Sequence, residues 1–469
     1  MGRRYFIETF GCQMNVLDSE LAEGQLRRLG WERTQQLGRA DLVLFNTCAV
    51  REHAEHKVWS RLGELARRKR RRPDLLVGVL GCMAQNHQQA LLERAPHVDL
   101  VLGPRQLGAL GEALQRLEAE RAPIVRADLT RPLDVQRDIA VRGARHTAFV
   151  TAMYGCDFRC SYCIVPSTRG REESRPIAEI RDEVERLCAD GVKEVTLLGQ
   201  TIDSWGKRLP GRPHLGQLLE AIHEVPGLER IRFVTSHPSL MREPILRAVA
   251  ELPKVCEYLH MPAQAGSDRI LRAMRRGYTV ARYLEVVERA RAIIGEDVAI
   301  ASDFIVGYPG ETEEDFQATL RLVEQVGFAQ AYIFKFSPRP HTEAWGLVDD
   351  VPEPVKRERN QRLLAAQEQV QARRHAALIG SRQQVLVEGR SRQDPSKLAG
   401  RNRHNRIVVF EGEEHEYVGR LVELEITDAT PLALYGRLPG RPALCASAAQ
   451  SLHARRPPPV RLRALPVVP

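Results

Sequence analysis

Three cysteines are clustered in one short loop, at Cys156, Cys160 and Cys163. A four-iron cluster held by three protein thiolates leaves one iron open to another ligand, and that iron would be a reaction site. A structural zinc site closes with four Cys or His ligands, whereas the nearest histidine in the sequence is His146. The loop directly follows residues 147–153, whose pattern predicts a strand. The spacing therefore favours an iron-sulfur cluster over zinc.

A second set of cysteines is spread over the first hundred residues. Four segments there predict strands followed by helices: residues 5–10, 41–46, 75–80 and 98–102. Such alternation predicts a parallel sheet, and ligands bind beyond the carboxyl ends of its strands. The first three strands each run into a cysteine, so we expect Cys12, Cys48 and Cys82 to meet at one edge and hold a second cluster. The alternative is a structural role in the core.

The remaining cysteines need no metal to explain them. Cys188 lies in a predicted helix, Cys256 in a predicted apolar strand and Cys445 in the tail, so packing or simple exposure accounts for all three.

The elements that would position these cysteines predict an α/β protein with several domains. Residues 1–120 are interpreted as a doubly wound parallel sheet and residues 121–145 as a linker. Residues 146–376 contain six strand-and-helix units, which predict an open, partial (β/α)6 barrel with its active site at the carboxyl ends of the strands. Residues 377–440 predict a small β-barrel, and the Pro- and Arg-rich residues 441–469 a disordered tail.

Each unit of the two barrels has a strand candidate. In the larger barrel these are residues 148–153, 194–198, 230–234, 255–259, 298–305 and 329–336. In the smaller barrel they are residues 384–388, 406–410 and 421–427.

The charge of the chain indicates a polyanionic partner. The formal net charge is +9 over 469 residues, which favours nucleic acid. Basic residues gather between the strands of the small barrel: Arg390, Arg392, Lys397, Arg401, Arg403, His404 and Arg406. We interpret them as an RNA surface, with a solvated loop as the alternative.

The sequence offers no targeting or membrane segment. The N-terminus has no apolar signal core, and no apolar run approaches the roughly 20 residues that span a membrane. A cytoplasmic protein with reduced thiols is the expectation.

The cysteine loop, with Tyr162 before its last cysteine, resembles the signature of radical S-adenosylmethionine (SAM) enzymes. Further segments resemble the methylthiotransferases of that superfamily: Gly-Cys-Gln-Met-Asn at 11–15, Asn-Thr-Cys-Ala-Val-Arg-Glu at 46–52 and Gly-Cys-Met-Ala-Gln at 81–85. Residues 425–429 and 434–436 resemble the TRAM RNA-binding domain of the family. The resemblance covers residues 1 to about 440.

The resemblance implies an enzyme that uses two four-iron clusters and two SAM molecules. One SAM would methylate a sulfur on the cluster held by Cys12, Cys48 and Cys82. The other would be cleaved at the cluster held by Cys156, Cys160 and Cys163, giving the radical that takes a hydrogen from adenine C2. Radical chemistry of this kind requires cofactors.

The N-terminal motifs also indicate which methylthiotransferases are most similar. They favour members that act on N6-(dimethylallyl)adenosine 3′ of the anticodon in tRNA. A sulfur donor and an electron donor such as flavodoxin or ferredoxin are implied, and we expect a monomer without membrane contact.

Several polar residues near predicted strand ends match family motifs and are expected contacts of SAM or substrate. They are Arg175, Gly199, Gln200, Gln264, Ser302 and Asp303. Gly199 and Gln200 end the second barrel strand, where many radical SAM enzymes bind the SAM amino group. A local structural role is the alternative for each. Five positions depart from the family pattern: Ser167, Thr201, Asp203, Ala265 and His341. These departures bear on the shape of the substrate pocket and not on the cysteines.

Three other functions remain open at this point. Two lie within the family: methylthiolation of threonylcarbamoyladenosine in tRNA, and methylthiolation of an aspartate in a ribosomal protein. The third is a non-enzymatic RNA-binding protein with structural metal sites, which predicts zinc instead of iron.

Overall fold

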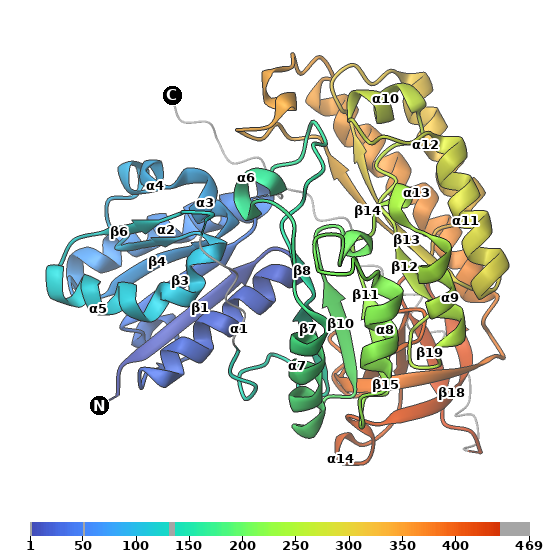
Figure 1. The fold of residues 1–469 in the computed structure, drawn as a ribbon, viewed down its shortest axis with the longest axis horizontal. Coiled ribbons are helices and arrows are strands. Elements are labelled where there is room, and N and C mark those ends of the chain that lie inside the picture. The colour runs from blue at the N-terminus through green and yellow to red at the C-terminus, as the bar shows by residue number, and fades with distance from the viewer. Residues whose placement is uncertain (1, 50–51, 131–136, 441–469) are drawn as a thin grey trace.

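The computed structural model describes residues 2–49, 52–130 and 137–440. Three regions follow one another along the chain: an N-terminal sheet domain, a central region of strands and helices, and a small C-terminal barrel (Figure 1). The predictions for the 441–469 tail, for Cys445 and for Arg51 of the N-terminal motif lie outside the described residues.

The N-terminal domain is a six-stranded parallel sheet in the order β2-β1-β3-β4-β5-β6. Its strands are β1 (Arg4–Phe10), β2 (Glu32–Arg33), β3 (Leu42–Thr47), β4 (Leu76–Gly81), β5 (Leu100–Leu102) and β6 (Ile124–Arg126). Its helices are α1 (Gln13–Arg28), α2 (Glu52–Arg71), α3 (Cys82–His87), α4 (Gln89–Arg94) and α5 (Leu110–Glu120), with the 3-10 turns η1 (Leu37–Arg39) and η2 (Pro104–Ala109).

Apolar side chains alternate along these strands and cover both faces of the sheet. Leu42 and Leu44 of β3 pack with α1 and α5, whereas Val43 and Phe45 pack with α2, α3 and α4. Successive strand residues point to opposite faces, so a strand this apolar must be covered on both sides. The predicted doubly wound sheet is confirmed.

The edge strand β6 differs from the sequence prediction. Residues 121–145 were expected to form a linker, yet Ile124 is buried and β6 pairs with β5. A strand of three residues leaves too short a pattern to recognise, and it forms because the edge of β5 is available for pairing.

The central region contains six parallel strands in two sets, β7-β10-β11 and β12-β13-β14. A single bridge between Ile231 and Val255 joins the sets, so the barrel is open. The strands are β7 (Thr147–Thr151), β10 (Glu194–Leu198), β11 (Arg230–Phe233), β12 (Tyr258–His260), β13 (Ala299–Val306) and β14 (Gln330–Lys335), with the small hairpin β8 (Met153–Tyr154) and β9 (Glu173–Ser174). The predicted α/β architecture is confirmed.

Helices cover the outer side of these strands, and the core between them is the largest in the molecule. They are α6 (Val165–Arg169), α7 (Ile177–Ala189), α8 (Leu215–His223), α9 (Glu243–Glu251), α10 (Asp268–Ala273), α11 (Val280–Ile294), α12 (Glu313–Val326) and α13 (Glu353–Ala376), with η3 (Ile202–Ser204), η4 (Pro238–Leu240) and η5 (Glu343–Gly346). Cys188 lies in α7 as expected, whereas Cys256 lies in the turn before β12 and not in a strand.

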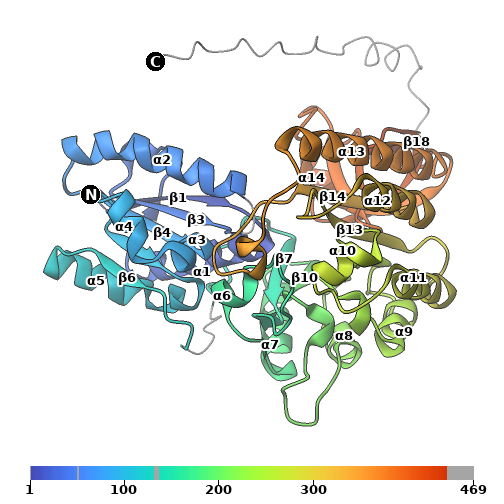
Figure 2. The same ribbon diagram turned by 90° about the horizontal axis from the view of Figure 1, so that it is seen from above.

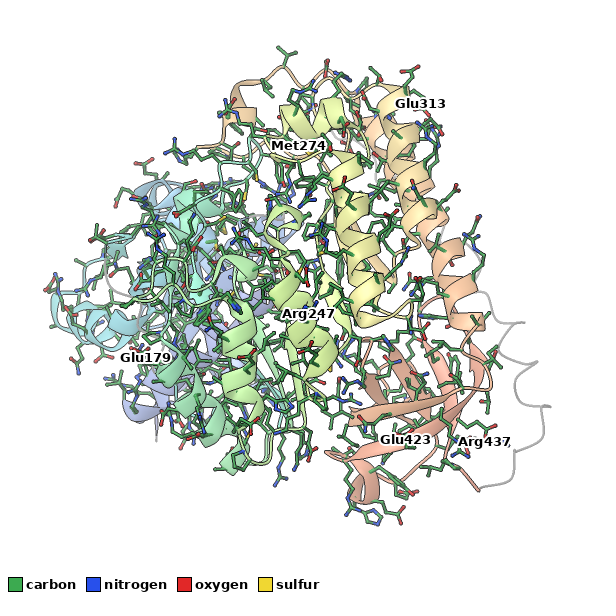
Figure 3. All side chains as sticks on the ribbon, turned by 45° about the vertical axis from the view of Figure 1, so that its right-hand side comes forward. Glu179, Arg247, Met274, Glu313, Glu423 and Arg437 are labelled. Atoms are coloured by element: carbon green, nitrogen blue, oxygen red, sulfur yellow. The ribbon has the colours of Figure 1, made fainter. Side chains whose placement is uncertain are left out.

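The C-terminal region is a closed five-stranded barrel in the order β15-β16-β17-β19-β18. It consists of β15 (Arg382–Arg390), β16 (Leu398–Asn402), β17 (Ile407–Phe410), β18 (Leu421–Ala429), β19 (Leu434–Arg437) and the short α14 (Glu414–Tyr417). Figure 3 shows Glu423 and Arg437 on this barrel, at the far end from Met274.

The small barrel is held against the amino-terminal ends of the central strands by buried arginines. Arg230 donates to the backbone oxygen of Arg401 at 2.7 Å, and Arg232 donates to that of Asn402 at 2.7 Å. Arg403 in turn pairs with Glu257 at 2.7 Å. These bonds fix the position of the barrel beneath the central sheet.

This contact corrects part of the predicted RNA surface. Arg406 is buried, and the side chain of Arg403 is held by Glu257 and is only 25% exposed, so neither is the freely exposed cation that was expected. Arg390 and Arg392 remain exposed. The sequence indicated the charge of this loop but not the direction in which each side chain points.

Candidate active site

The first three strands of the N-terminal sheet bring the early cysteines together. Phe10 of β1 pairs with Thr47 of β3, and Thr47 pairs with Gly81 of β4, so the three strands end side by side. Cys12, Cys48 and Cys82 follow these ends directly. A hydrogen bond with Cys48 lowers the pKa of the Cys12 thiol to about 5. This N-terminal cysteine site therefore favours a thiolate even before metal binds.

Two asparagines hold the N-terminal cysteine site in place. The Asn15 Oδ1 accepts from the Cys12 backbone at 3.3 Å and lies 3.4 Å from its Sγ. Asn15 Nδ2 donates to Asn46 Oδ1 at 3.2 Å, and Asn46 Nδ2 donates to the Asn15 backbone oxygen at 2.8 Å. Sequence reasoning had noted both residues only as members of motifs. Their type was the available signal, because buried amides must find hydrogen-bond partners.

Gly81 explains why the chain can turn so closely there. Its φ is +85°, and an added Cβ would lie 2.3 Å from Asn46 Oδ1 and 2.9 Å from the Thr47 oxygen. Only glycine fits this conformation and this space without strain.

The loop with Cys156, Cys160 and Cys163, here called the loop cysteine site, follows the β8 strand. Cys156 Sγ lies 3.2 Å from Thr201 Oγ1, and Arg276 Nη1 donates to Cys160 Sγ at 3.3 Å. Burial raises the pKa of the Cys163 thiol to about 12, and the charge of Cys160 adds to the rise. The Cys163 thiol would therefore lose its proton only when a metal binds.

Contacts from distant elements fix the shape of the loop. The Ser161 backbone donates to the Met274 oxygen at 3.1 Å, and its Oγ donates to the Ala273 oxygen at 2.9 Å. Met274 follows α10 and is labelled in Figure 3. Phe158, within the loop, stacks on His237 with ring centroids 4.2 Å apart.

The two cysteine sites lie next to each other across a domain boundary. Cys82 packs with Ile164, the residue after Cys163. Met14 and Leu17 of α1 pack with Tyr154 of β8 and Leu198 of β10 in the same apolar cluster as Cys12. Figure 2 shows α6 and β7 between the N-terminal domain and the rest of the central region.

Arg169 of α6 belongs to the central region and contacts the N-terminal domain at the boundary. Its Nη2 donates to Asp18 Oδ2 of α1 at 2.6 Å, and its Nη1 donates to Tyr154 at 2.5 Å. Burial raises the pKa of Cys82, and the positive charge of Arg169 opposes this rise. A residue of the central region thus contributes to the electrostatics of the N-terminal cysteine site.

The residues present fit clusters better than single ions. Cysteines at the ends of neighbouring strands are separated by roughly the 4.8 Å strand spacing, which suits a group with several irons.

Unpaired polar atoms at the same strand ends fit a polar ligand such as SAM. Gln200 Oε1, Glu172 Oε1, Ser236 Oγ and His237 Nε2 are buried and have no hydrogen-bond partner among the described residues. Buried polar atoms without partners are rare in proteins, so a group that the chain binds would satisfy them. Gln200 and Ser236 follow β10 and β11, at the carboxyl edge predicted for the active site.

The predicted SAM contacts fall into two groups, of which the first consists of Gly199, Gln200, Gln264 and Asp303. Gly199 and Gln200 lie at the open strand edge, and an added Cβ on Gly199 would lie 2.5 Å from Met153 Cγ. Asp303 pairs with His260 at 3.2 Å, and Gln264 adopts a φ of +71° beside it.

The second group has its polar atoms engaged by protein. Arg175 donates to the Thr151 oxygen and to Glu183, both at 2.7 Å. Ser302 Oγ accepts from the Ala263 backbone at 2.9 Å. The structure therefore places Arg175 and Ser302 among the residues that support the edge.

Three residues near the loop cysteine site were not among the predicted contacts: His237, Arg276 and Asp203, the last of which was named only as a departure from the family pattern. Asp203 accepts from the His237 backbone at 2.8 Å, and burial raises the pKa of Asp203 to about 8. Burial also lowers the pKa of His237 to about 3. Asp203 follows β10, His237 follows β11 and Arg276 follows α10, so spacing in the sequence gave no signal of their proximity.

Models of known families match all three regions. Residues 4–103 match the uncharacterized protein family UPF0004, residues 150–323 the radical SAM superfamily and residues 376–438 the TRAM domain. In the described residues, every helix is too short or too polar to cross a membrane.

Solved structures share the fold at low sequence identity. The radical SAM methyltransferase TsrM from Kitasatospora setae has a TM-score of 0.53 and 17% identity, covering 73% of this chain and 75% of that one. The cobalamin-dependent SAM radical enzyme OxsB has a TM-score of 0.50 and 12% identity, covering 78% of this chain and 56% of that one. The match of residues 150–323 to the radical SAM superfamily, on a fold of this kind, defines the class of protein as a radical SAM enzyme.

Curated relatives are much more similar. The tRNA-2-methylthio-N(6)-dimethylallyladenosine synthase of Bordetella avium is 45% identical over 93% of this chain and 92% of its own length. The synthase of the same name from Carboxydothermus hydrogenoformans is 44% identical over 93% of this chain and 99% of its own length. The chain belongs to the family of tRNA-2-methylthio-N(6)-dimethylallyladenosine synthases.

Proposed function

We propose that the protein inserts a methylthio group at C2 of N6-(dimethylallyl)adenosine, 3′ of the anticodon in tRNA. The relatives that share 44–45% identity over 93% of the chain carry this activity in their names. The observation that carries the proposal is the proximity of two cysteine sites, each with three thiolates, at one domain boundary.

The division of roles follows from where the residues lie. Cys156, Cys160 and Cys163 would hold the cluster that binds SAM, since the unpaired oxygen of Gln200 lies at the same strand edge. Cys12, Cys48 and Cys82 would hold the second cluster. When bound, these groups supply the radical and sulfur chemistry that side chains cannot.

The protein itself contributes position and exclusion of water. Buried contacts at the boundary, such as Arg169 with Asp18, keep the two sites at a fixed separation. Apolar side chains, including Met14 and Leu198, surround the N-terminal cysteine site. A reactive radical is protected from side reactions when water is kept away.

The partners follow from this activity. A tRNA substrate agrees with the TRAM match at residues 376–438 and with the net charge of +9. The reaction also needs a sulfur donor and a low-potential electron donor such as flavodoxin or ferredoxin. We infer a cytoplasmic monomer, because tRNA is modified in that compartment and both cysteine sites are supplied by one chain.

Mass spectrometry of tRNA nucleosides tests the activity. A bacterial strain that lacks its own enzyme of this kind should regain 2-methylthio-N6-(dimethylallyl)adenosine when it expresses this chain. Expression of the Cys160→Ala variant serves as the control and should restore none. A methylthio group found instead on threonylcarbamoyladenosine, or on an aspartate of a ribosomal protein, would identify the other two activities.

Metal analysis tests the enzyme class separately. Protein purified without oxygen should contain about eight irons and be brown, because each site holds a four-iron cluster. Stoichiometric zinc and a colourless protein would support a structural role of the metal sites.

A further inference from the structure

Arg276 is a buried arginine that contacts the loop cysteine site from outside the loop. Its side chain donates three hydrogen bonds, each to a different group. Nη1 donates to Cys160 Sγ at 3.3 Å, Nε to Tyr278 Oη at 3.1 Å and Nη2 to the Pro262 oxygen at 3.1 Å. Its guanidinium also lies 5.3 Å from the centroid of the Tyr278 ring. The direction of the Nη1 group is therefore fixed by its other two bonds.

The charge of Arg276 has no carboxylate counterpart among the described residues. Its largest charge interactions are with Tyr162, Tyr278 and Cys160. No ion pair joins Asp203 to Arg276 in the described part of the chain, and burial raises the pKa of Asp203 to about 8, which leaves most of this carboxyl neutral at pH 7. A buried charge without a partner is costly, so the thiolates of the loop are the natural counter-charge of Arg276.

Among the described residues, the other buried arginines pair with carboxylates, with the exception of Arg406. Arg169 contacts Asp18 at 2.6 Å, and Arg359 contacts Glu311 at 2.8 Å. Arg169 is the one beside the N-terminal cysteine site, where Asp18 balances its charge. The loop cysteine site therefore has beside it an arginine, Arg276, without a carboxylate partner, whereas the arginine beside the N-terminal cysteine site has one.

The local backbone explains why Arg276 points inward and its neighbour does not. Arg275 and Gly277 have φ values of +55° and +70°, which make a tight turn after α10. Arg275 points outward, with a side chain 56% exposed that pairs with Glu343 at 2.6 Å. The chain therefore offers two adjacent arginines of which only one reaches a cysteine.

We propose that Arg276 is a positioning residue that raises the reduction potential of the cluster at the loop cysteine site. This inference rests on the proposed function. Reduction adds one electron from an external donor to the cluster, with no bond formed or broken and no proton lost by Arg276. A positive charge and a hydrogen bond at the sulfur stabilise the more negative, reduced state.

The test is a redox titration of full-length protein with both clusters, followed by electron paramagnetic resonance. The signal of the loop cluster is assigned by its loss in the Cys160→Ala variant. Arg276→Gln should lower the equilibrium constant for one-electron reduction at least tenfold, which corresponds to about 59 mV. Arg275→Gln is the matched control and should leave the potential unchanged, and the N-terminal cluster should be unaffected by either change.

Arg276→Lys separates charge from geometry. Lysine keeps the charge but cannot hold Cys160, Tyr278 and Pro262 at once, so we expect a smaller decrease in the same direction. If Arg276→Gln does not bind iron, the redox titration is carried out on Arg276→Lys instead. An equilibrium constant for one-electron reduction within twofold of the parent value in the iron-loaded variant would overturn the inference. Absence of any cluster in the parent protein would instead contradict the proposed function.

Discussion

The N-terminal cysteine site and the loop cysteine site present the same number of thiolates, but the chain assembles them in opposite ways. Cys12, Cys48 and Cys82 come from three separate turns that the register of β1, β3 and β4 brings together. The other three lie within eight consecutive residues, and contacts from distant strands fix their shape. The geometry of the N-terminal cysteine site therefore depends on the pairing of the sheet strands. The geometry of the loop cysteine site depends on the residues packed around its loop.

The protonation of the thiols differs in the same way. The pKa of Cys12 is lowered to about 5 by Cys48, whereas burial raises that of Cys163 to about 12. Cys12 thus favours the thiolate before metal binds, whereas burial raises the pKa of Cys163 and also that of Cys82, so these thiols keep their protons until metal arrives. Two sites with the same number of cysteine ligands can therefore differ in how far the protonation of their thiols depends on the bound cluster.

The largest expected effect comes from removing the thiolates of one site at a time. Alanine at Cys156, Cys160 and Cys163 should abolish both SAM cleavage and methylthiolation and leave about four irons. Alanine at the three N-terminal cysteines should also leave about four irons but retain SAM cleavage to 5′-deoxyadenosine.

Iron analysis and chromatography of the SAM products measure both outcomes. Cys188→Ala in α7 is the control, since this half-buried cysteine lies away from both sites. Equal loss of SAM cleavage in both triple variants would show that the sites do not have separate roles.

The next effect concerns the arginine that joins the N-terminal cysteine site to the central region. Arg169 and Asp18 are 3% and 4% exposed, so Arg169→Ala leaves a buried carboxylate unpaired and should cost about 3–5 kcal/mol. Arg171→Ala, two residues along with a side chain 82% exposed, should change stability by less than about 0.5 kcal/mol. Urea unfolding followed by circular dichroism compares the two, and similar losses would contradict this role for Arg169.

The thiols of the metal-free protein provide a third comparison. At pH 7 Cys12 is mostly thiolate, whereas Cys163 is almost entirely protonated. Allowing for the weaker nucleophilicity of a low-pKa thiolate, Cys12 should react about 100-fold faster with iodoacetamide. Peptide mass spectrometry after short exposures gives both rates. The ratio of the two reaction rates should fall as the pH rises, because only Cys163 gains thiolate. A ratio that stays constant with pH would contradict the difference in pKa between the two thiols.

The smallest effect tests the turn before Cys82. Gly81 and Gly191 have similar φ values of +85° and +92°, but only Gly81 has atoms within 4 Å of an added Cβ. Gly191→Ala should cost about 1–3 kcal/mol through backbone strain alone and keep all the iron. Gly81→Ala should cost more and lose the N-terminal cluster selectively, as judged by unfolding and iron content. Full iron content in Gly81→Ala would show that the sheet tolerates a shifted turn.

Sequence patterns predicted the strands that are long and apolar. The predicted strand at 194–198 coincides with β10, since buried parallel strands are continuous apolar runs. β16 and β19 were missed, because short segments such as Leu398–Asn402 with Gly and Arg become strands only by pairing around the barrel. The strand expected at 255–259 begins later, at Tyr258, because Val255 makes a single bridge.

Cysteines of the candidate site could be selected from spacing, but their surroundings could not. Arg276 lies 116 residues from Cys160, and a single arginine in a turn has no distinguishing pattern. The same holds for Arg403, whose charge suggested RNA but whose side chain binds Glu257. Contacts of this kind depend on the tertiary fold and are not encoded in local periodicity.

The attachment of the small barrel through Arg230 and Arg232 has a consequence for the size of molecule that can be recognised. These arginines lie at the start of β11, whereas both cysteine sites lie beyond the opposite ends of the strands. A strand of five residues such as β10 is about 16 Å long. A free nucleoside is too small to touch both ends at once, but a folded RNA can do so. A substrate that contacts the small barrel and the cysteine sites together must therefore span at least this distance.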